Sequence, residues 1–211
     1  MEGLVLAVVL GYLLGSLPTA QLAALRLAGV DLRRRAGTIS GSALYYEVAR
    51  WAPIPVGLID VTKGVAATAL PLWLGESRAV AVTGGVSAVV GHNWSVWLAF
   101  RGGRGLSPFL GMLVVLFPLG ALLLLLALGI GRLLRQTPVV VLVTLALLPG
   151  VILTGGGGRE VACGALGMFG VTVVKRLEAN RRPLPADPET RRRVLWRRLW
   201  LDRDTRAWPS T

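Results

Sequence analysis

The sequence is poor in the residues that build metal sites and disulfides. Its 211 residues include one histidine, His92, and one cysteine, Cys163. A single cysteine excludes an internal disulfide, and one histidine with scattered carboxylates gives no cluster at metal-ligand spacing, so we expect neither a metal nor another cofactor. Cys163 lies in an apolar segment, which favours a small buried residue.

Charged residues are also scarce, and those of negative sign are the scarcer. Only 16% of the chain is charged, with 23 Lys and Arg against 11 Asp and Glu, whereas 54% is hydrophobic. This is the composition of a membrane protein. A net charge of +12 can indicate nucleic-acid binding, but no stacking aromatics are interleaved with the cations in an exposed domain, so we expect no nucleic acid. An anionic lipid membrane is the partner that the charge predicts.

Long apolar runs fill most of the chain and are separated by short polar segments. Each approaches or exceeds the roughly 17 to 25 residues that cross a hydrocarbon core, and they cover residues 4–27, 52–75, 79–100, 106–130 and 138–154. A shorter, glycine-rich run at 161–174 favours a re-entrant or packed half-helix. We therefore predict an all-α integral membrane helical bundle with at least five crossings and five to seven helices.

The N-terminal run lacks a basic leader and is expected to remain as the first helix. Its small residues Gly11, Gly15 and Ser16 predict close helix packing, and Pro18 predicts a kink in the helix. Ser16 and Pro18 are also candidates for opening a cavity. After a membrane-embedded domain at 1–177, residues 178–211 form a basic amphipathic tail. There Asp187 and Pro188 are expected to begin a helix at the inner membrane surface.

The distribution of arginine predicts the orientation in the membrane. Four arginines lie in the loop at 31–50, two in the turn around Gly103, and twelve Lys or Arg follow from Arg159 onward. The two intervening turns, which we expect on the outer side, carry only Arg78 and the pair Arg132 and Arg135. The positive-inside rule then places the N-terminus outside and the basic regions in the cytoplasm.

The stretch GHNWSVWLAFRGGRG at 91–105 carries the strongest signal for a functional site. A histidine within the membrane costs free energy unless it is paired, hydrated or functional, and His92 is therefore a candidate site residue. A glycine-rich turn that carries cations can offer backbone N–H groups to an anion. We therefore predict a phosphate site at the membrane surface, built from Arg101, Gly102, Gly103, Arg104 and Gly105.

Two further segments are candidates for the same site. Asp60 and Lys63 lie three residues apart on one face of the second apolar run, which suits either mutual pairing or a direct ligand role. The polar loop before it is rich in hydroxyls and poor in bulk, so Thr38, Ser40 and Ser42 can approach a phosphate. An ordinary Gly/Ser loop has the same composition.

The order of these motifs resembles that of a known family. GSLP, D-x-R before a Gly/Ser-rich loop, D-x-x-K-G and G-H-N-W followed by F-R-G-G-R-G resemble the bacterial acyl-phosphate:glycerol-3-phosphate acyltransferases. The resemblance runs from about Gly11 to Gly105 and continues weakly to Leu177. It implies a seven-helix bundle in the bacterial cell membrane, with its active site near the cytoplasmic face. It also implies transfer of an acyl chain from acyl phosphate to glycerol 3-phosphate, giving lysophosphatidic acid.

The resemblance assigns roles to the candidate residues. Arg101 and Arg104, with the N–H groups of the turn glycines, would hold phosphate; Arg104 stands where the family pattern has lysine. His92 would orient or deprotonate the attacking hydroxyl, or only hydrogen-bond a substrate.

Two family motifs are largely replaced in this chain. Of the first-loop pattern G-S-G-N-x-G-A-T-N-x-x-R only Gly41 remains, and of H-R-x-N-I-x-R-L-x-x-G-x-E only Arg176 and Leu177. These losses suit an alternative, a non-catalytic relative that binds phosphate-bearing lipid or a partner protein at the inner membrane face. A transporter or channel gains little support, because the apolar runs at 106–130 and 138–154 contain no ionisable residue at their midplanes.

Overall fold

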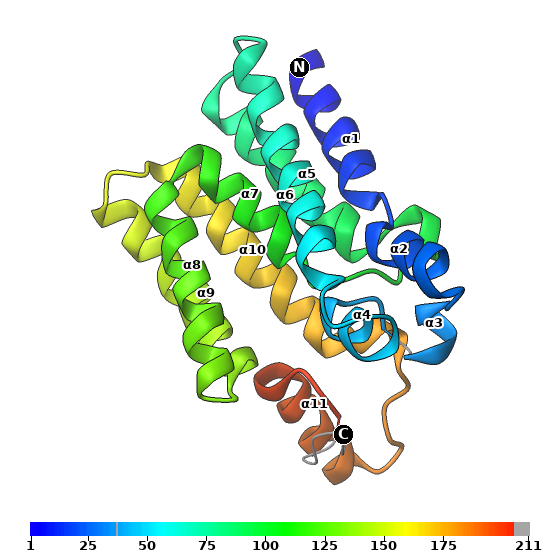
Figure 1. Cartoon of the computed structure of the whole chain (residues 1–211). Helices are drawn as coiled ribbons and strands as arrows, with labels where there is room; N and C mark the ends of the chain where they lie inside the picture. The colour runs from blue at the N-terminus through cyan, green and yellow to red at the C-terminus, as the bar shows by residue number, and fades with distance from the viewer. Residues whose placement is uncertain (37, 205–211) are drawn as a thin grey trace.

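The computed structural model describes residues 1–36 and 38–204, and within these ranges its regular elements are helices (Figure 1). This confirms the predicted all-α class. Two short 3-10 turns, Val96–Leu98 and Ala179–Arg181, accompany the α-helices. The α-helices are α1 (Glu2–Ser16), α2 (Thr19–Ala28), α3 (Leu32–Arg35), α4 (Gly41–Glu47), α5 (Pro53–Trp73), α6 (Arg78–Asn93), α7 (Leu106–Leu116), α8 (Pro118–Leu133), α9 (Thr137–Thr154), α10 (Arg159–Glu178) and α11 (Pro188–Leu201).

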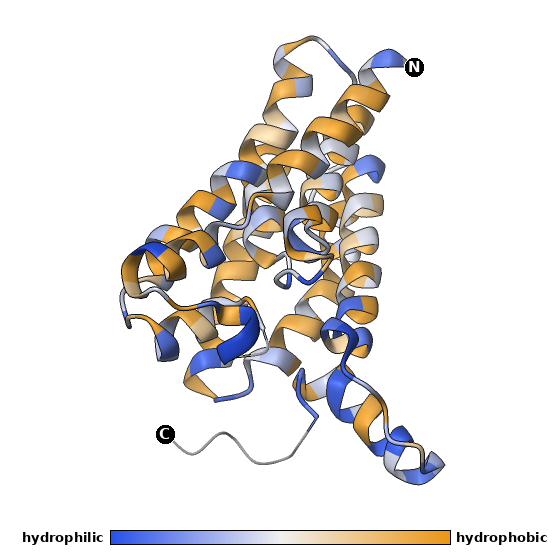
Figure 2. Ribbon diagram, turned by 90° about the vertical axis from the view of Figure 1, so that its right-hand side faces the viewer, coloured by the Kyte–Doolittle hydropathy of each residue, from blue (hydrophilic) through white to orange (hydrophobic). Residues whose placement is uncertain are grey.

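The helices form a bundle whose outer surface is apolar. Three stretches of the described chain are long and apolar enough to cross a membrane, namely Glu2–Ala28, Pro53–Trp73 and Thr137–Thr154, and α7 and α8 are shorter apolar helices. Large side chains such as Leu122, Leu125 and Leu126 of α8 point outward and are about half exposed. Figure 2 shows hydrophilic residues gathered toward the end of the bundle where α11 lies. Such a surface suits lipid, in agreement with the predicted integral membrane bundle.

The first apolar run is broken at Leu17 and Pro18, where α1 ends and α2 begins. Before the break, α1 packs directly against the backbone of α6. A Cβ on Gly11 or Gly15 would overlap the carbonyl oxygen of Gly84 or Ala88 on that helix. The small residues therefore bring the two backbones together, as predicted.

The run at 106–130, expected to be one crossing, is two helices that meet at Phe117 and Pro118. Pro118 disfavours a helical conformation at the preceding residue, and Phe117 is extended with φ −157° and ψ 79°. Arg78, at the start of α6, donates to Leu116 O, so α7 ends beside the N-terminus of α6. The chain then returns through α8 (Figure 1).

This reversal changes the predicted place of the Arg132 to Arg135 turn. Arg176, near the end of α10, donates to Pro138 O at the start of α9. The turn before α9 therefore lies at the same end of the bundle as the C-terminus of α10. The expectation of an outer turn there was wrong. Arg132 and Arg135 lie at the same end of the bundle as the other basic regions, so more of the basic residues gather at one end than predicted.

Helix α10 corrects two further expectations. It spans 20 residues and is not a half-helix. Of its glycines, Gly164 is buried against Val82 of α6, whereas Gly167 and Gly170 are exposed. Cys163, on another face of α10, is exposed. Its predicted burial in the protein was wrong.

The polar loop between α2 and α5 is folded into a small cap. Leu32, Ile39 and Leu44 are buried in one apolar cluster together with Leu98. Since Leu98 belongs to the loop after α6, this cluster fixes the two candidate loops against each other.

The C-terminal helix docks on the bundle through buried arginine. Asp187 caps α11 by accepting from Thr190 N at 2.8 Å, as predicted. At the other end of α11 the side chain of Arg198 is 2% exposed. Its guanidinium donates to the backbone carbonyls of Leu177, Arg182 and Pro183 and to the Asp204 carboxylate. The predicted tail also includes residues 205–211, which lie outside the described residues.

Candidate functional site

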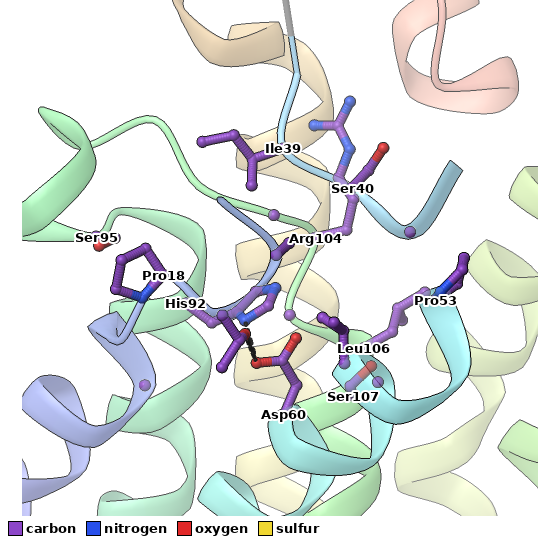
Figure 3. Close-up of a pocket in the computed structure, with 18 of the residues that line it drawn as sticks. Pro18, Ile39, Ser40, Pro53, Asp60, His92, Ser95, Arg104, Leu106 and Ser107 are labelled. Atoms are coloured by element: carbon purple, nitrogen blue, oxygen red, sulfur yellow. Dashed lines mark hydrogen bonds and ion pairs between the residues drawn. The ribbon is translucent and has the colours of Figure 1, made fainter. Parts of the chain in front are cut away.

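A cavity of about 360 Å³ lies at the basic end of the bundle. This is within the range of roughly 300 to 1,000 Å³ typical of small-molecule sites. Figure 3 shows its walls, which come from the α1–α2 break, the start of α4, the first half of α5, the end of α6 and the loop that enters α7. Of the predicted site residues, those that line it are Ser40, Ser42, Asp60, His92, Gly103, Arg104 and Gly105.

Asp60 and Lys63 form a buried ion pair on α5. Lys63 Nζ lies 2.7 Å from Asp60 Oδ1, and the two side chains are 5% and 6% exposed. The same ammonium donates to Leu17 O at 2.6 Å and to Thr19 Oγ1 at 3.1 Å. Asp60 lines the cavity, whereas Lys63 satisfies the carbonyl group freed by the helix break. The pairing alternative is therefore the one that the geometry of Lys63 supports.

Thr19 joins this pair and lines the cavity, although the sequence did not single it out. Its hydroxyl donates to Asp60 Oδ1 at 2.6 Å, the hydrogen bond drawn in Figure 3. Thr19 directly follows the Pro18 that marks the helix break. A hydroxyl at the first residue after a predicted break was the signal that could have identified it.

His92 projects from the end of α6 toward Asp60 (Figure 3). Its Nδ1 lies 3.8 Å from Asp60 Oδ1, and its side chain is 18% exposed. Across the ring, Nε2 abuts Gly103, where a Cβ would overlap the imidazole. The ring is thus held between a carboxylate and a glycine, in contact with the cavity.

The backbone of the glycine turn caps α6. Gly102 N donates to Asn93 O and Gly103 N donates to His92 O, each at 3.0 Å. The last carbonyl groups of a helix need such partners. The N–H groups of Gly102 and Gly103 are therefore engaged within the chain, and the expectation that they would cradle a phosphate was wrong. Gly105, with φ 73°, is the residue that precedes α7, and it lines the cavity wall.

The two arginines of the turn occupy different environments. Arg104 lines the cavity and Arg101 is exposed outside it. Arg104 Nη1 donates to Lys175 O at 2.9 Å, and Nη2 lies 2.7 Å from Asp202 Oδ1. Burial raises the pKa of the Asp202 carboxyl, against the opposing influence of Arg104 and Arg176. Only Arg104 of the two is placed to reach a ligand in the cavity.

The polar loop contributes to the cavity through its second half. Ser40 caps α4, where it accepts from Ala43 N at 3.2 Å, and Ser40, Gly41 and Ser42 line the wall. Thr38 lies outside the lining residues. The loop therefore contributes two of its three candidate hydroxyls to the cavity wall.

Ser16 and Pro18, the candidates for opening a cavity, both line its wall. Ser95, Asn93 and Glu178 were missed because they come together with the site only in three dimensions. Ser95 lines the wall, and its Oγ donates to Ser16 O at 2.5 Å. Asn93 is fully buried next to Gly105, and within the described residues neither polar atom of its side chain has a hydrogen-bond partner. Glu178 accepts from Trp94 Nε1 and from Lys175 Nζ, which ties the end of α10 to the loop after α6.

Together, the fold and the cavity define an integral membrane helical protein with a polar site at its basic end. A sequence profile described as Glycerol-3-phosphate acyltransferase matches residues 5–184. Glycerol-3-phosphate acyltransferase 1 of Dehalococcoides mccartyi is 34% identical over 92% of this chain and 98% of its own. Glycerol-3-phosphate acyltransferase of Synechococcus sp. is 34% identical over 88% of this chain and 94% of its own.

The chain belongs to the glycerol-3-phosphate acyltransferase family, and so to the acyltransferase enzymes. Its fold is similar to the crystal structure of PlsY (YgiH), an integral membrane glycerol 3-phosphate acyltransferase, in the glycerol 3-phosphate form. The TM-score is 0.74 at 24% identity, covering 85% of this chain and 90% of that one.

Proposed function

We propose that this protein transfers an acyl chain from acyl phosphate to glycerol 3-phosphate, giving lysophosphatidic acid and inorganic phosphate. The relatives' names support glycerol 3-phosphate as the acceptor. The structurally similar PlsY is described in a glycerol 3-phosphate form and in a lysophosphatidic acid form. The observation that carries the proposal is the cavity itself, which has His92 and Asp60 on one wall and Arg104 on another.

Arg104 and the start of α7 form the proposed phosphate-binding side. The first N–H groups of a helix have no partners within it, and together with the helix dipole they favour an anion. Leu106 and Ser107, the first two residues of α7, line the cavity together with Arg104. A guanidinium beside a helix N-terminus can hold a phosphate through charge-assisted hydrogen bonds.

His92 is the proposed general base. The acceptor hydroxyl would lose its proton to His92 while its oxygen attacks the carbonyl carbon of the acyl phosphate. The bond between that carbon and the phosphate oxygen then breaks, and phosphate leaves with the bonding electrons. Asp60 Oδ1, 3.8 Å from Nδ1, favours the imidazolium that results. Because an acyl phosphate is already activated, the site mainly needs to position its substrates and stabilise charge.

We further propose that the basic end faces the cytoplasm of a bacterial cell and that α11 lies near anionic lipid. At the opposite end, the basic residues of the described chain are Arg78 and Arg159, which begin α6 and α10. The positive-inside rule favours this orientation. On α11, Arg191, Arg192 and Arg193 are exposed, and Trp196 is 63% exposed. Cationic and aromatic side chains together suit a membrane surface.

The proposal is tested by a product assay with protein purified into anionic lipid nanodiscs. Acyl phosphate and labelled glycerol 3-phosphate should yield lysophosphatidic acid and phosphate in equal amounts. His92→Gln should lower kcat by about 10²- to 10⁴-fold, with intact folding checked by thermal unfolding. If glycerol 3-phosphate binds but the unsubstituted chain forms no product, the protein is a non-catalytic relative. A His92→Gln variant with unchanged kcat would remove His92 from the mechanism.

A further inference from the structure

The C-terminal tail contacts a residue of the cavity wall, although the tail lies largely outside the part of the chain that the family profile matches. That match ends at residue 184, before α11 begins at Pro188. Asp202 directly follows α11, and its Oδ1 lies 2.7 Å from Nη2 of Arg104. A residue of the tail therefore contacts the arginine to which we assign phosphate binding.

The position of Asp202 is fixed by the docking of α11. Arg198 buries its guanidinium among backbone carbonyls at the end of α10 and beyond. From the other side, Arg176 of α10 donates to Leu199 O at 2.8 Å. The hydrogen bonds of these two arginines fix the last turn of α11 against the end of α10. The position of Asp202, the residue that follows α11, is fixed with it. Figure 1 shows α11 close to the ends of α9 and α10.

The residues that contact the guanidinium of Arg104 lie outside the cavity that Arg104 itself lines. Arg104 lines the cavity, whereas Asp202 and Lys175 do not. Lys175 O accepts a hydrogen bond from Nη1, and Asp202 Oδ1 forms an ion pair with Nη2. Both terminal nitrogens therefore contact residues that do not line the cavity. The side chains of Arg104 and Asp202 are 27% and 23% exposed, but the contacting oxygen, Asp202 Oδ1, is itself buried.

We propose that Asp202 is a positioning residue that holds the guanidinium of Arg104 ready for the phosphate of the substrate. The inference rests on the proposed function, in which Arg104 binds that phosphate. A free arginine side chain populates many rotamers, and ordering it on binding lowers affinity. A carboxylate that orders it beforehand removes part of this cost. Because Asp202 lies outside the cavity, it supports Arg104 without occupying the phosphate position.

Steady-state kinetics of Asp202→Ala and Asp202→Asn in nanodiscs test the inference. Both changes should raise the KM for glycerol 3-phosphate by about 3- to 10-fold with little change in kcat. Asp202→Glu should restore part of the affinity, because it restores the carboxylate. In an Arg104→Ala background, Asp202→Ala should change KM no further. A merely structural role of Asp202 would not give this loss of effect.

Asp187→Ala is the matched control, since it removes another carboxylate from the same tail, at the far end of α11. Its KM should equal that of the unsubstituted protein.

An Asp202→Asn variant with unchanged KM, while Arg104→Ala raises KM, would overturn the inference and leave the proposed function intact. A lowered KM would show that Asp202 competes with the substrate. An unchanged KM in Arg104→Ala would instead refute the role of Arg104 in the proposed function. If Asp202→Ala does not fold, the isosteric Asp202→Asn decides.

Discussion

Two ion pairs border the cavity, and they differ in burial, origin and consequence. Asp60 and Lys63 lie on one helix, are 6% and 5% exposed, and share further hydrogen bonds with Thr19 and Leu17. Arg104 and Asp202 come from distant parts of the chain and are each about a quarter exposed. The first pair closes the helix break and presents a carboxylate to His92. In the second pair Arg104 lines the cavity, where we propose that it binds a phosphate, and Asp202 does not.

The comparison separates stability from recognition. Removing one member of a buried pair leaves an uncompensated charge, which destabilises the protein strongly. A partly exposed pair is screened by solvent and contributes less to stability. Changes at Asp60 and Lys63 should therefore act first on folding, and changes at Arg104 and Asp202 first on substrate binding.

The largest effect is expected at Lys63. Lys63→Met leaves the Asp60 carboxylate buried without its cation, and should lower the free energy of unfolding by about 3 to 5 kcal/mol. Thermal or denaturant unfolding in detergent measures this loss. Asp60→Asn combined with Lys63→Met should recover most of the stability but not the activity. A stable single variant would show that Lys63 is not needed to compensate Asp60.

A smaller loss of stability is expected at Thr19. Thr19→Val keeps the shape of the side chain but removes both the donor to Asp60 and an acceptor of Lys63. A cost of about 1 to 3 kcal/mol follows for hydrogen bonds to buried charged groups. Thr62→Val is the matched control, because the Thr62 hydroxyl donates to Leu58 O on an exposed helix face. The free energy of unfolding is measured for both variants. Equal losses in both variants would contradict the special role of Thr19.

Gly103→Ala tests the cavity with little direct effect on either pair. The new Cβ would overlap Nε2 of His92 and displace the imidazole. Misplacing a catalytic group by about 1 Å can cost about 10²-fold in rate, so kcat should fall by 10- to 100-fold with a modest loss of stability. Product formation and thermal unfolding of the same preparation separate the two effects. Unchanged turnover would mean that the position of His92 is not critical.

The smallest effect is expected at an exposed pair, Asp31 and Arg33. Their hydrogen bonds lower the pKa of Asp31 from 3.8 to about 2. The carboxylate therefore favours the folded state above about pH 4, and this contribution is lost as the pH falls toward 2. Asp31→Asn should lower the unfolding temperature slightly at pH 7, and the difference from the unsubstituted protein should narrow near pH 3. A constant difference would exclude this ionisation as its cause.

Features that depend on near neighbours in the sequence were predictable. The spacing of Asp60 and Lys63 places them on one helical face, Pro18 marks a helix break, and Gly11 permits close packing. His92 and Arg104 stood out because such side chains are rare among apolar runs. In each case the chemistry of one residue, or the spacing within one helical turn, was sufficient to predict the feature.

Features that depend on the path of the chain were not predictable from composition. Whether Phe117 and Pro118 bend a helix or reverse it depends on the partners of α7 and α8. The N–H groups of Gly102 and Gly103 turn to α6 because its terminal carbonyls lie beside them. The contact of Asp202 with Arg104 exists only because α11 docks through Arg198. Long-range packing decided all three.

The most direct test of the cavity as the glycerol 3-phosphate site compares the two arginines of one turn. Arg104 lines the cavity and Arg101 is exposed outside it. The quantity to measure is the KM for glycerol 3-phosphate of Arg104→Ala and Arg101→Ala in the same nanodiscs. We expect Arg104→Ala to raise KM by about 10- to 100-fold, the loss of a charged hydrogen bond, and Arg101→Ala to change it by less than about 2-fold. Equal effects, or a larger effect at Arg101, would contradict the placement of the site in this cavity.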